Sequence, residues 1–143
     1  IIAASVFGQY MSWERIPHQL TKSILAISDS VWVILIVINV LLLVLGMFPE
    51  GGALLIIVAP LLVPLIKTMN VDLIHFGLIM IVNIMIGGIT PPFGSMMFTT
   101  CAITGVTVGQ FVREIWPFIL ALLVVLVVVT YMPAVVMFLP NLL

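Results

Sequence analysis

Long stretches without a charged side chain constrain this sequence more than any other feature. Asp, Glu, Lys and Arg are absent from residues 30–49, 51–66, 73–112 and 115–143, which are 20, 16, 40 and 29 residues long. A helix that spans a bilayer needs about 20 largely apolar residues. The pattern therefore predicts that the chain crosses or enters a membrane several times.

The composition is typical of a membrane protein and excludes several classes of protein. Charged residues are 6% of the chain and hydrophobic residues 64%, whereas soluble domains average about 25% and about 45–50%. The four Lys and Arg residues provide no basic patch for nucleic acid. The single cysteine, Cys101, excludes an internal disulfide and a zinc cluster. These counts exclude a soluble enzyme, a disordered tail and a nucleic-acid binder.

Residues 1–28 predict the end of an earlier helix followed by a connector at the membrane surface. The chain begins at Ile1 without a methionine or a basic leader, so we expect it to be a piece of a longer protein. Trp13 and Lys22 belong to types that favour the headgroup level of a bilayer. Pro17 interrupts any single long helix in this region.

Two apolar helices with a break between them are predicted within residues 29–67. The stretches 29–45 and 53–66 are separated by Gly-Met-Phe-Pro-Glu-Gly-Gly, which is unlike a continuous helix. Asp29 and its serine neighbours are good N-cap residues for the first helix. Two geometries fit: two thin spans joined by an external loop, or one re-entrant hairpin whose tip lies inside the membrane.

The rest of the chain predicts a discontinuous helix, a surface helix and one full span. Residues 75–104 carry no formal charge and are broken by Gly-Gly-Ile-Thr-Pro-Pro-Phe-Gly-Ser, the pattern of a discontinuous transmembrane helix. Residues 105–116 have apolar and polar sides and predict an interfacial amphipathic helix. Residues 117–139 predict a C-terminal span that is uninterrupted until Pro133.

The two breaks are the candidate binding sites. Each offers freed backbone carbonyls, glycines that let a ligand approach, and helix ends with their dipoles. Secondary transporters build ion and substrate sites from such interrupted helices, and Na⁺, as a hard cation, prefers oxygen ligands. Thr90 adds a hydroxyl, and Pro91 and Pro92 leave carbonyls unpaired because they lack N–H groups. The alternative is a plain kink without a ligand.

Single polar residues have both a binding and a structural interpretation. Glu50 is an intramembrane carboxylate, a class that is usually functional, or it caps backbone N–H groups at a wet loop tip. Asn39 and Asn83 are candidates for ligation, with an interhelical hydrogen bond as the favoured alternative. His75 is a proton relay or, as we favour, a helix cap. No Ser-His-Asp set, metal-ligand spacing or phosphate loop is apparent, so we expect no catalytic site.

Four motifs, in this order and spacing, resemble the C-terminal third of the large membrane subunit of TRAP transporters (tripartite ATP-independent periplasmic transporters). They are residues 46–50, the Ala-Leu-Leu-Ile-Ile-Val-Ala-Pro-Leu-Leu-Val-Pro-Leu run at 53–65, the Val-Asp-Leu-Ile-His-Phe-Gly run at 71–77, and 87–94. The resemblance extends in pattern over residues 30–139. The family often has Met-Asp where Pro-Glu precedes Gly51 here, so the acid is kept in kind.

The resemblance implies an all-α integral membrane fold that is the second inverted repeat of an elevator-type transporter, with residues 29–67 as a re-entrant hairpin and 75–104 as the broken helix. It implies a sodium site between the hairpin tip and the broken-helix loop. The sodium residues carried over are Gly46, Met47, Glu50, Gly87, Gly88, Thr90 and Pro91. The substrate-binding candidates are Asn83, Pro92 and Gly94.

The resemblance also implies partners and a location. The substrate is an organic acid of the C4-dicarboxylate or sialic acid class, delivered by a periplasmic substrate-binding protein. The partners are the rest of the large subunit, a small membrane subunit that is separate or fused, and the lipid bilayer of the bacterial inner membrane. A channel, an unrelated broken-helix transporter and a purely structural membrane subunit are the alternatives, and the charges leave the orientation open.

Overall fold

The computed structural model describes residues 6, 9–11, 13–14, 16–26, 28, 30–48, 50–138, 140 and 142. Of the expected end of an earlier helix at residues 1–8, residues 1–5, 7 and 8 lie outside this description, as do the N-cap role of Asp29 and the position of Pro49. Every element within the described part is helical, without a strand. The helices are α2 (Ile16–Leu25), α3 (Val31–Gly46), α4 (Gly51–Thr68), α5 (Leu73–Ile89), α6 (Ser95–Thr104), α7 (Val108–Tyr131) and α8 (Pro133–Met137).

Helices α3 and α4 form a hairpin whose connection lies between Gly46 and Gly51. The break is shorter than the sequence predicts, because Gly46 belongs to α3 and both Gly51 and Gly52 belong to α4. Glu50 makes this possible at the start of α4, since its side chain accepts hydrogen bonds from the N–H groups of Gly52 and Ala53. Helix α4 consequently has 18 residues, more than the 16 of α3, and it continues through two internal prolines.

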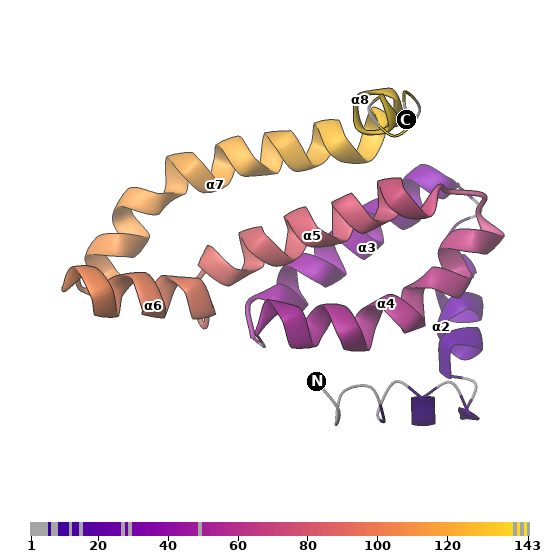
Figure 1. Ribbon diagram of the computed structural model, residues 1–143, viewed down its shortest axis with the longest axis horizontal. Helices are drawn as coiled ribbons and strands as arrows, with labels where there is room; N and C mark the ends of the chain where they lie inside the picture. The colour runs from indigo at the N-terminus through magenta and orange to yellow at the C-terminus, as the bar shows by residue number, and fades with distance from the viewer. Residues whose placement is uncertain are drawn as a thin grey trace.

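Helices α5 and α6 are the two halves of the predicted broken helix, separated by residues 90–94. Here too the helix extends further than expected, because Gly87 and Gly88 are helical and α5 ends at Ile89. Asp72 caps the start of α5 by accepting from the N–H groups of two following residues. Figure 1 shows α3 and α5 side by side, with the hairpin tip beside the end of α5.

Helix α7 differs from the prediction of a separate surface helix over 105–116 and a span over 117–139. It is one 24-residue helix that begins at Val108 and contains Pro117. A capping box formed by Thr107 and Gln110 starts the helix well before the proline, whose missing N–H removes one hydrogen bond without ending it. Figure 1 shows α7 changing direction in its first turns and then running alongside α5. The predicted interruption at Pro133 is present, between α7 and α8.

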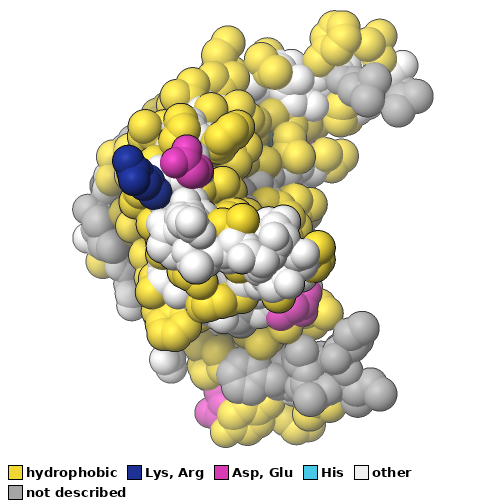
Figure 2. Space-filling model, turned by 90° about the vertical axis from the view of Figure 1, so that its left-hand side faces the viewer, with side chains coloured by type: hydrophobic (Ala, Val, Ile, Leu, Met, Phe, Trp, Pro, Cys, Tyr) yellow, Lys and Arg dark blue, Asp and Glu magenta, His cyan; other side chains and the backbone are white. Residues whose placement is uncertain are grey.

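The buried core has two parts that meet on α5. One lies between α5 and the hairpin arms and includes Ile38, Leu62 and Phe76, and the other lies between α5 and α7 around Ile79 and Ile119. Much of the remaining surface is apolar, and Figure 2 shows hydrophobic side chains over most of the visible face with few charged groups. Helices α4 and α7 are long and apolar enough to cross a membrane, whereas α3, α5 and α6 are shorter apolar helices.

Candidate functional site

The hairpin tip and the helix break meet through two glycines. A Cβ atom built on Gly87 would lie 2.6 Å from the carbonyl carbon of Gly46, and one built on Gly46 would lie 3.3 Å from the Cα atom of Gly87. Real Cβ atoms do not approach other atoms as closely as 2.6 Å, so no side chain fits on Gly87. The structure therefore brings together Gly46 and Gly87, two of the predicted sodium residues, at the point where α3 and α5 pack closely.

Aromatic rings add a second contact between the same two segments. Phe48, beside Met47 at the tip, and Phe93, which follows Pro91 and Pro92 in the loop, have ring centroids 5.3 Å apart. Offset aromatic pairs at such distances are attractive by about 0.5–1.5 kcal/mol. The predicted tip and loop residues thus come from two docked segments, although 40 or so positions separate them in the sequence.

Glu50 has the structural role that the sequence analysis left open. Its Oε1 atom accepts a hydrogen bond from the Gly52 N–H at 3.1 Å, and its Oε2 atom accepts one from the Ala53 N–H at 3.2 Å. The side chain therefore caps α4 while remaining solvent-exposed. Each carboxylate oxygen can accept more than one hydrogen bond or cation contact, so ligation of sodium by Glu50 stays a prediction.

The break loop gathers oxygen atoms around one glycine. A Cβ atom on Gly94 would lie 2.5 Å from the carbonyl oxygen of Gly88 and 2.9 Å from that of Thr90. The Thr90 hydroxyl donates to the Ile86 carbonyl at 2.6 Å, and its oxygen keeps lone pairs for a further partner. Two carbonyls and one hydroxyl from predicted sodium residues thus lie where α5 passes into the break loop, and a side chain on Gly94 would disturb them.

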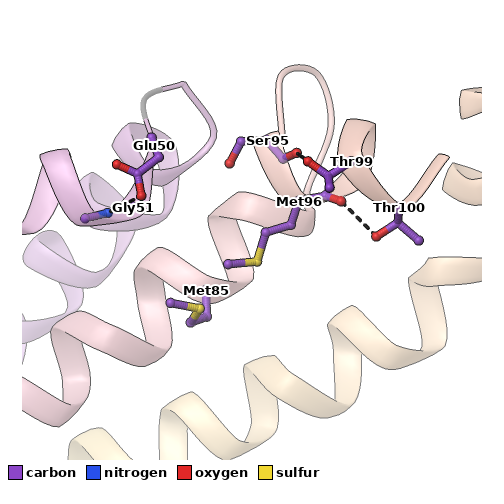
Figure 3. Close-up of a pocket in the computed structure, with 8 residues that line it drawn as sticks. Glu50, Gly51, Met85, Ser95, Met96, Thr99 and Thr100 are labelled. Atoms are coloured by element: carbon purple, nitrogen blue, oxygen red, sulfur yellow. Dashed lines mark hydrogen bonds between the residues drawn. The ribbon is translucent and has the colours of Figure 1, made fainter. Parts of the chain in front are cut away.

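A cavity of about 520 Å³ lies between the hairpin tip and α6. Figure 3 shows Glu50 and Gly51 on one side of it, Ser95 and Thr99 on the other, and Met85 on α5 along the floor. The remaining lining residues are Gly52, Met96 and Thr100. Among the predicted site residues only Glu50 lines this cavity. The polar start of α6 was missed, because Ser95 after the Gly94 break signals a helix start but not that this start faces a cavity.

Two helices begin at the cavity, and their ends differ. Glu50 caps α4, whereas Gly94 at the N-cap position of α6 has no side chain and gives no cap hydrogen bond. Helix N-termini carry a partial positive charge and free N–H groups that favour anions. The cavity therefore combines a carboxylate, which attracts a cation, with an uncapped helix end and the Ser95 hydroxyl, which suit an anion.

Asn83 lies away from this cavity, in the helix interface. It is fully buried, and its Nδ2 atom donates to the Asn39 Oδ1 atom at 2.8 Å and to the Ile79 carbonyl at 2.8 Å. The interhelical hydrogen bond favoured from the sequence is thus present. Its substrate-binding role stays a prediction. Among the described residues, no group of three or more His, Cys, Asp or Glu side chains could hold a metal ion.

Comparison with known proteins places this arrangement in a family. The family described as "Tripartite ATP-independent periplasmic transporter, DctM component" matches residues 1–135. The chain belongs to this family. It is therefore a bacterial membrane protein, and its named relatives are TRAP transporter permeases rather than enzymes.

Relatives with curated names support the membership. The chain is 41% identical over 141 residues to the C4-dicarboxylate TRAP transporter large permease protein DctM of Pseudomonas aeruginosa, covering 99% of this chain and 33% of that protein. It is 38% identical over 135 residues to the isethionate TRAP transporter permease protein DctMQ of Oleidesulfovibrio alaskensis, covering 94% and 21%. It is 36% identical over 143 residues to the sialic acid TRAP transporter permease protein SiaT of Haemophilus influenzae, covering 100% and 23%. The chain thus spans a third or less of these relatives.

Proposed function

We propose that this chain forms the second inverted repeat of a sodium-coupled TRAP permease that imports an organic acid by an elevator mechanism. The contact between the hairpin tip and the end of α5, through Gly46 and Gly87, supports the proposal, and so does the cavity that Glu50 lines beside the tip. Such interrupted helices are the usual material of transporter binding sites. The chain is a multi-pass protein of the bacterial inner membrane in this proposal.

Sodium binds between the tip and the loop. The ligands are oxygens of Glu50, Gly88 and Thr90, and the close Gly46–Gly87 contact holds the two segments at a fixed separation. Met47 and Pro91, which the resemblance also assigns to the sodium site, contribute backbone oxygens. A hard cation suits this set because carbonyl, hydroxyl and carboxylate oxygens replace its water shell.

The organic acid binds in the cavity between the tip and α6. Its acidic group lies at the uncapped start of α6, near Ser95, where free N–H groups and the helix dipole favour negative charge. The names of the relatives refer to C4-dicarboxylate, isethionate and sialic acid, which are all anions at neutral pH. A bound sodium ion near Glu50 balances the charge of the substrate and couples the two binding events.

The intact transporter contains further parts. The rest of the large subunit supplies the first repeat and the other half of the substrate site. A small membrane subunit, separate or fused, supports the large one, and a periplasmic substrate-binding protein delivers the acid. These expectations rest on the family membership.

Uptake of a labelled organic acid into proteoliposomes tests the proposal with the intact permease and its binding protein. We expect uptake to require an inward sodium gradient. Thr90→Val, which keeps the shape and removes the hydroxyl, should raise the sodium concentration for half-maximal uptake by about tenfold, the equivalent of 1.4 kcal/mol. Thr90→Ser, which keeps the hydroxyl, should stay close to the unmodified protein.

Two results would count against this function. Unchanged sodium activation in the Thr90→Val protein would contradict the sodium site. Downhill flux of the acid that is independent of the binding protein would indicate a channel.

A further inference from the structure

A second cavity, of about 320 Å³, lies among α5, α6 and α7. Every described side chain that lines it is hydrophobic, including Ile89 at the end of α5 and Leu122 and Val125 of α7. We call it the apolar cavity, and we call the cavity of about 520 Å³ between the hairpin tip and α6 the tip cavity. None of the sodium or substrate residues predicted from the sequence lines the apolar cavity, so the proposed function leaves it without a role.

Two methionines belong to both cavities. Met85 of α5 and Met96 of α6 line the tip cavity and the apolar cavity alike. Figure 3 shows the Met96 side chain reaching from the start of α6 toward α5, on which Met85 lies. A Cβ atom built on Gly88 would lie 3.5 Å from both the Cγ and the Sδ atom of Met96, so this side chain lies over the last turn of α5. The two thioether side chains therefore form a boundary that the cavities share.

Side-chain rotation is enough to open this boundary. Met85 is 46% exposed and Met96 is 39% exposed, so the core does not hold either side chain in place. Methionine is unbranched, has three rotatable bonds and adapts to irregular spaces. A ligand in the tip cavity therefore reaches the apolar cavity by displacing the thioether ends, without movement of a helix.

The anion-binding end of the tip cavity adjoins the boundary. Ser95 and Met96 are consecutive residues at the start of α6, where the proposed function places the acidic group of the substrate. A hydrocarbon chain attached to an acid at this position meets the Met96 thioether within a few bonds. Each CH₂ group that moves from water into an apolar cavity favours binding by about fourfold, the equivalent of 0.8 kcal/mol.

We propose that the apolar cavity is a subsite for the hydrocarbon part of organic acids, and that Met85 and Met96 are specificity-determining residues at its entrance. The permease then takes acids with an apolar chain in addition to short acids, which occupy the tip cavity alone. This inference rests on the proposed function, in which the acidic group binds at the start of α6.

Two matched pairs of acids test the inference with the intact permease in lipid nanodiscs, in sodium and without the binding protein. Ethanesulfonate is compared with hexanesulfonate, and succinate with 2-hexylsuccinate. The acidic groups match isethionate and C4-dicarboxylate, which the names of two relatives contain. Calorimetric titration gives the dissociation constants. We expect the longer acid of a pair to bind at least tenfold more tightly, since about fourfold is gained for each CH₂ group that enters the apolar cavity.

A variant that fills the apolar cavity locates the hydrocarbon chain. Val125→Phe enlarges a side chain of the apolar cavity and leaves every residue that lines the tip cavity unchanged. We expect it to bind the short acids as the unmodified permease does and to lose the advantage of the long acids. Val124→Phe is the matched control, because Val124 is 64% exposed and does not line the cavity. Partition of hexyl chains into the lipid is the same for both variants and cannot imitate this difference.

A variant at the boundary tests the role of the methionines. Met96→Ile keeps a similar size but introduces a β-branched side chain with restricted rotation. We expect it to weaken the binding of hexanesulfonate severalfold more than the binding of ethanesulfonate. An equal effect on both acids would show that Met96 does not control entry into the apolar cavity.

The outcomes separate this inference from the proposed function. Long acids that bind no more tightly than short ones, or that do not bind, would overturn the inference. A hexyl advantage that persists in the Val125→Phe protein would also overturn it, because the chain would then lie elsewhere. The proposed function fails by a different result, which is the absence of sodium-dependent binding of succinate, ethanesulfonate and N-acetylneuraminate.

Discussion

Individual glycines in this chain have different roles that the sequence alone does not separate. Gly46 and Gly87 allow two helices to touch, Gly94 leaves room for two carbonyl oxygens, and Gly105 adopts a positive φ of 72° at the end of α6. Gly77 lies in α5 with nothing within 4 Å of a built Cβ atom. A pattern of glycine and proline marks a break, but the neighbours in space decide what each glycine does.

Substitution of Gly87 tests the contact between tip and break. Gly87→Ala places a Cβ atom 2.6 Å from the Gly46 backbone and must push α3 away from α5. We expect a loss of about 1–3 kcal/mol of stability, as for other overpacked sites, measured by the unfolding of the purified permease. Gly77→Ala is the matched control on the same helix, and alanine there should be neutral or stabilising by up to about 1 kcal/mol. Equal stability of the two variants would contradict the contact.

Substitution of Glu50 separates its role as the N-cap of α4 from its proposed role as a sodium ligand. Glu50→Gln removes the charge and keeps an acceptor for one of the two N–H groups of α4. We expect stability to fall by less than about 1 kcal/mol, while the sodium concentration for half-maximal uptake rises severalfold. Glu50→Ala should lose both properties. A Glu50→Gln protein with unchanged sodium dependence would show that this carboxylate is only a cap.

At the level of helices, charge gaps and breaks predicted the hairpin and the broken helix to within a few residues. The exceptions arise from contacts that local patterns do not contain. Gly87 stays helical because α3 packs against it, and α7 passes through Pro117 because its capping box begins the helix earlier. The cavity wall at Ser95 was missed for the same reason, since it exists only when α6 faces the hairpin tip.

A double-mutant cycle measures the bond between α3 and α7. Asn39→Leu and Thr130→Val each leave a buried polar partner unsatisfied, so each should cost about 1–3 kcal/mol. The double variant should cost less than the sum, because both partners are then apolar. Unfolding of the purified permease provides all four free energies. Strict additivity would show that the hydrogen bond contributes nothing to the docking of α7.

The molecule as a whole has a largely apolar exterior. Large hydrophobic side chains are exposed on most helices, as Ile103 and Phe118 illustrate, and this surface suits lipid and the rest of the permease. The family follows from the order of four motifs in the sequence, and the match over residues 1–135 confirms it. Substrate, ion coupling and direction of movement could not be derived from a chain that covers a third of the length of its relatives.

A high-resolution density map of the intact permease in lipid and sodium is the most direct test of the central claim. The account predicts both breaks within the hydrocarbon layer and an ion between them, with oxygens of Thr90 and its neighbours at about 2.4 Å, as for hard cations of similar size. A map in which the tip and the loop lie apart, outside the bilayer and facing bulk water without an ion, would contradict it.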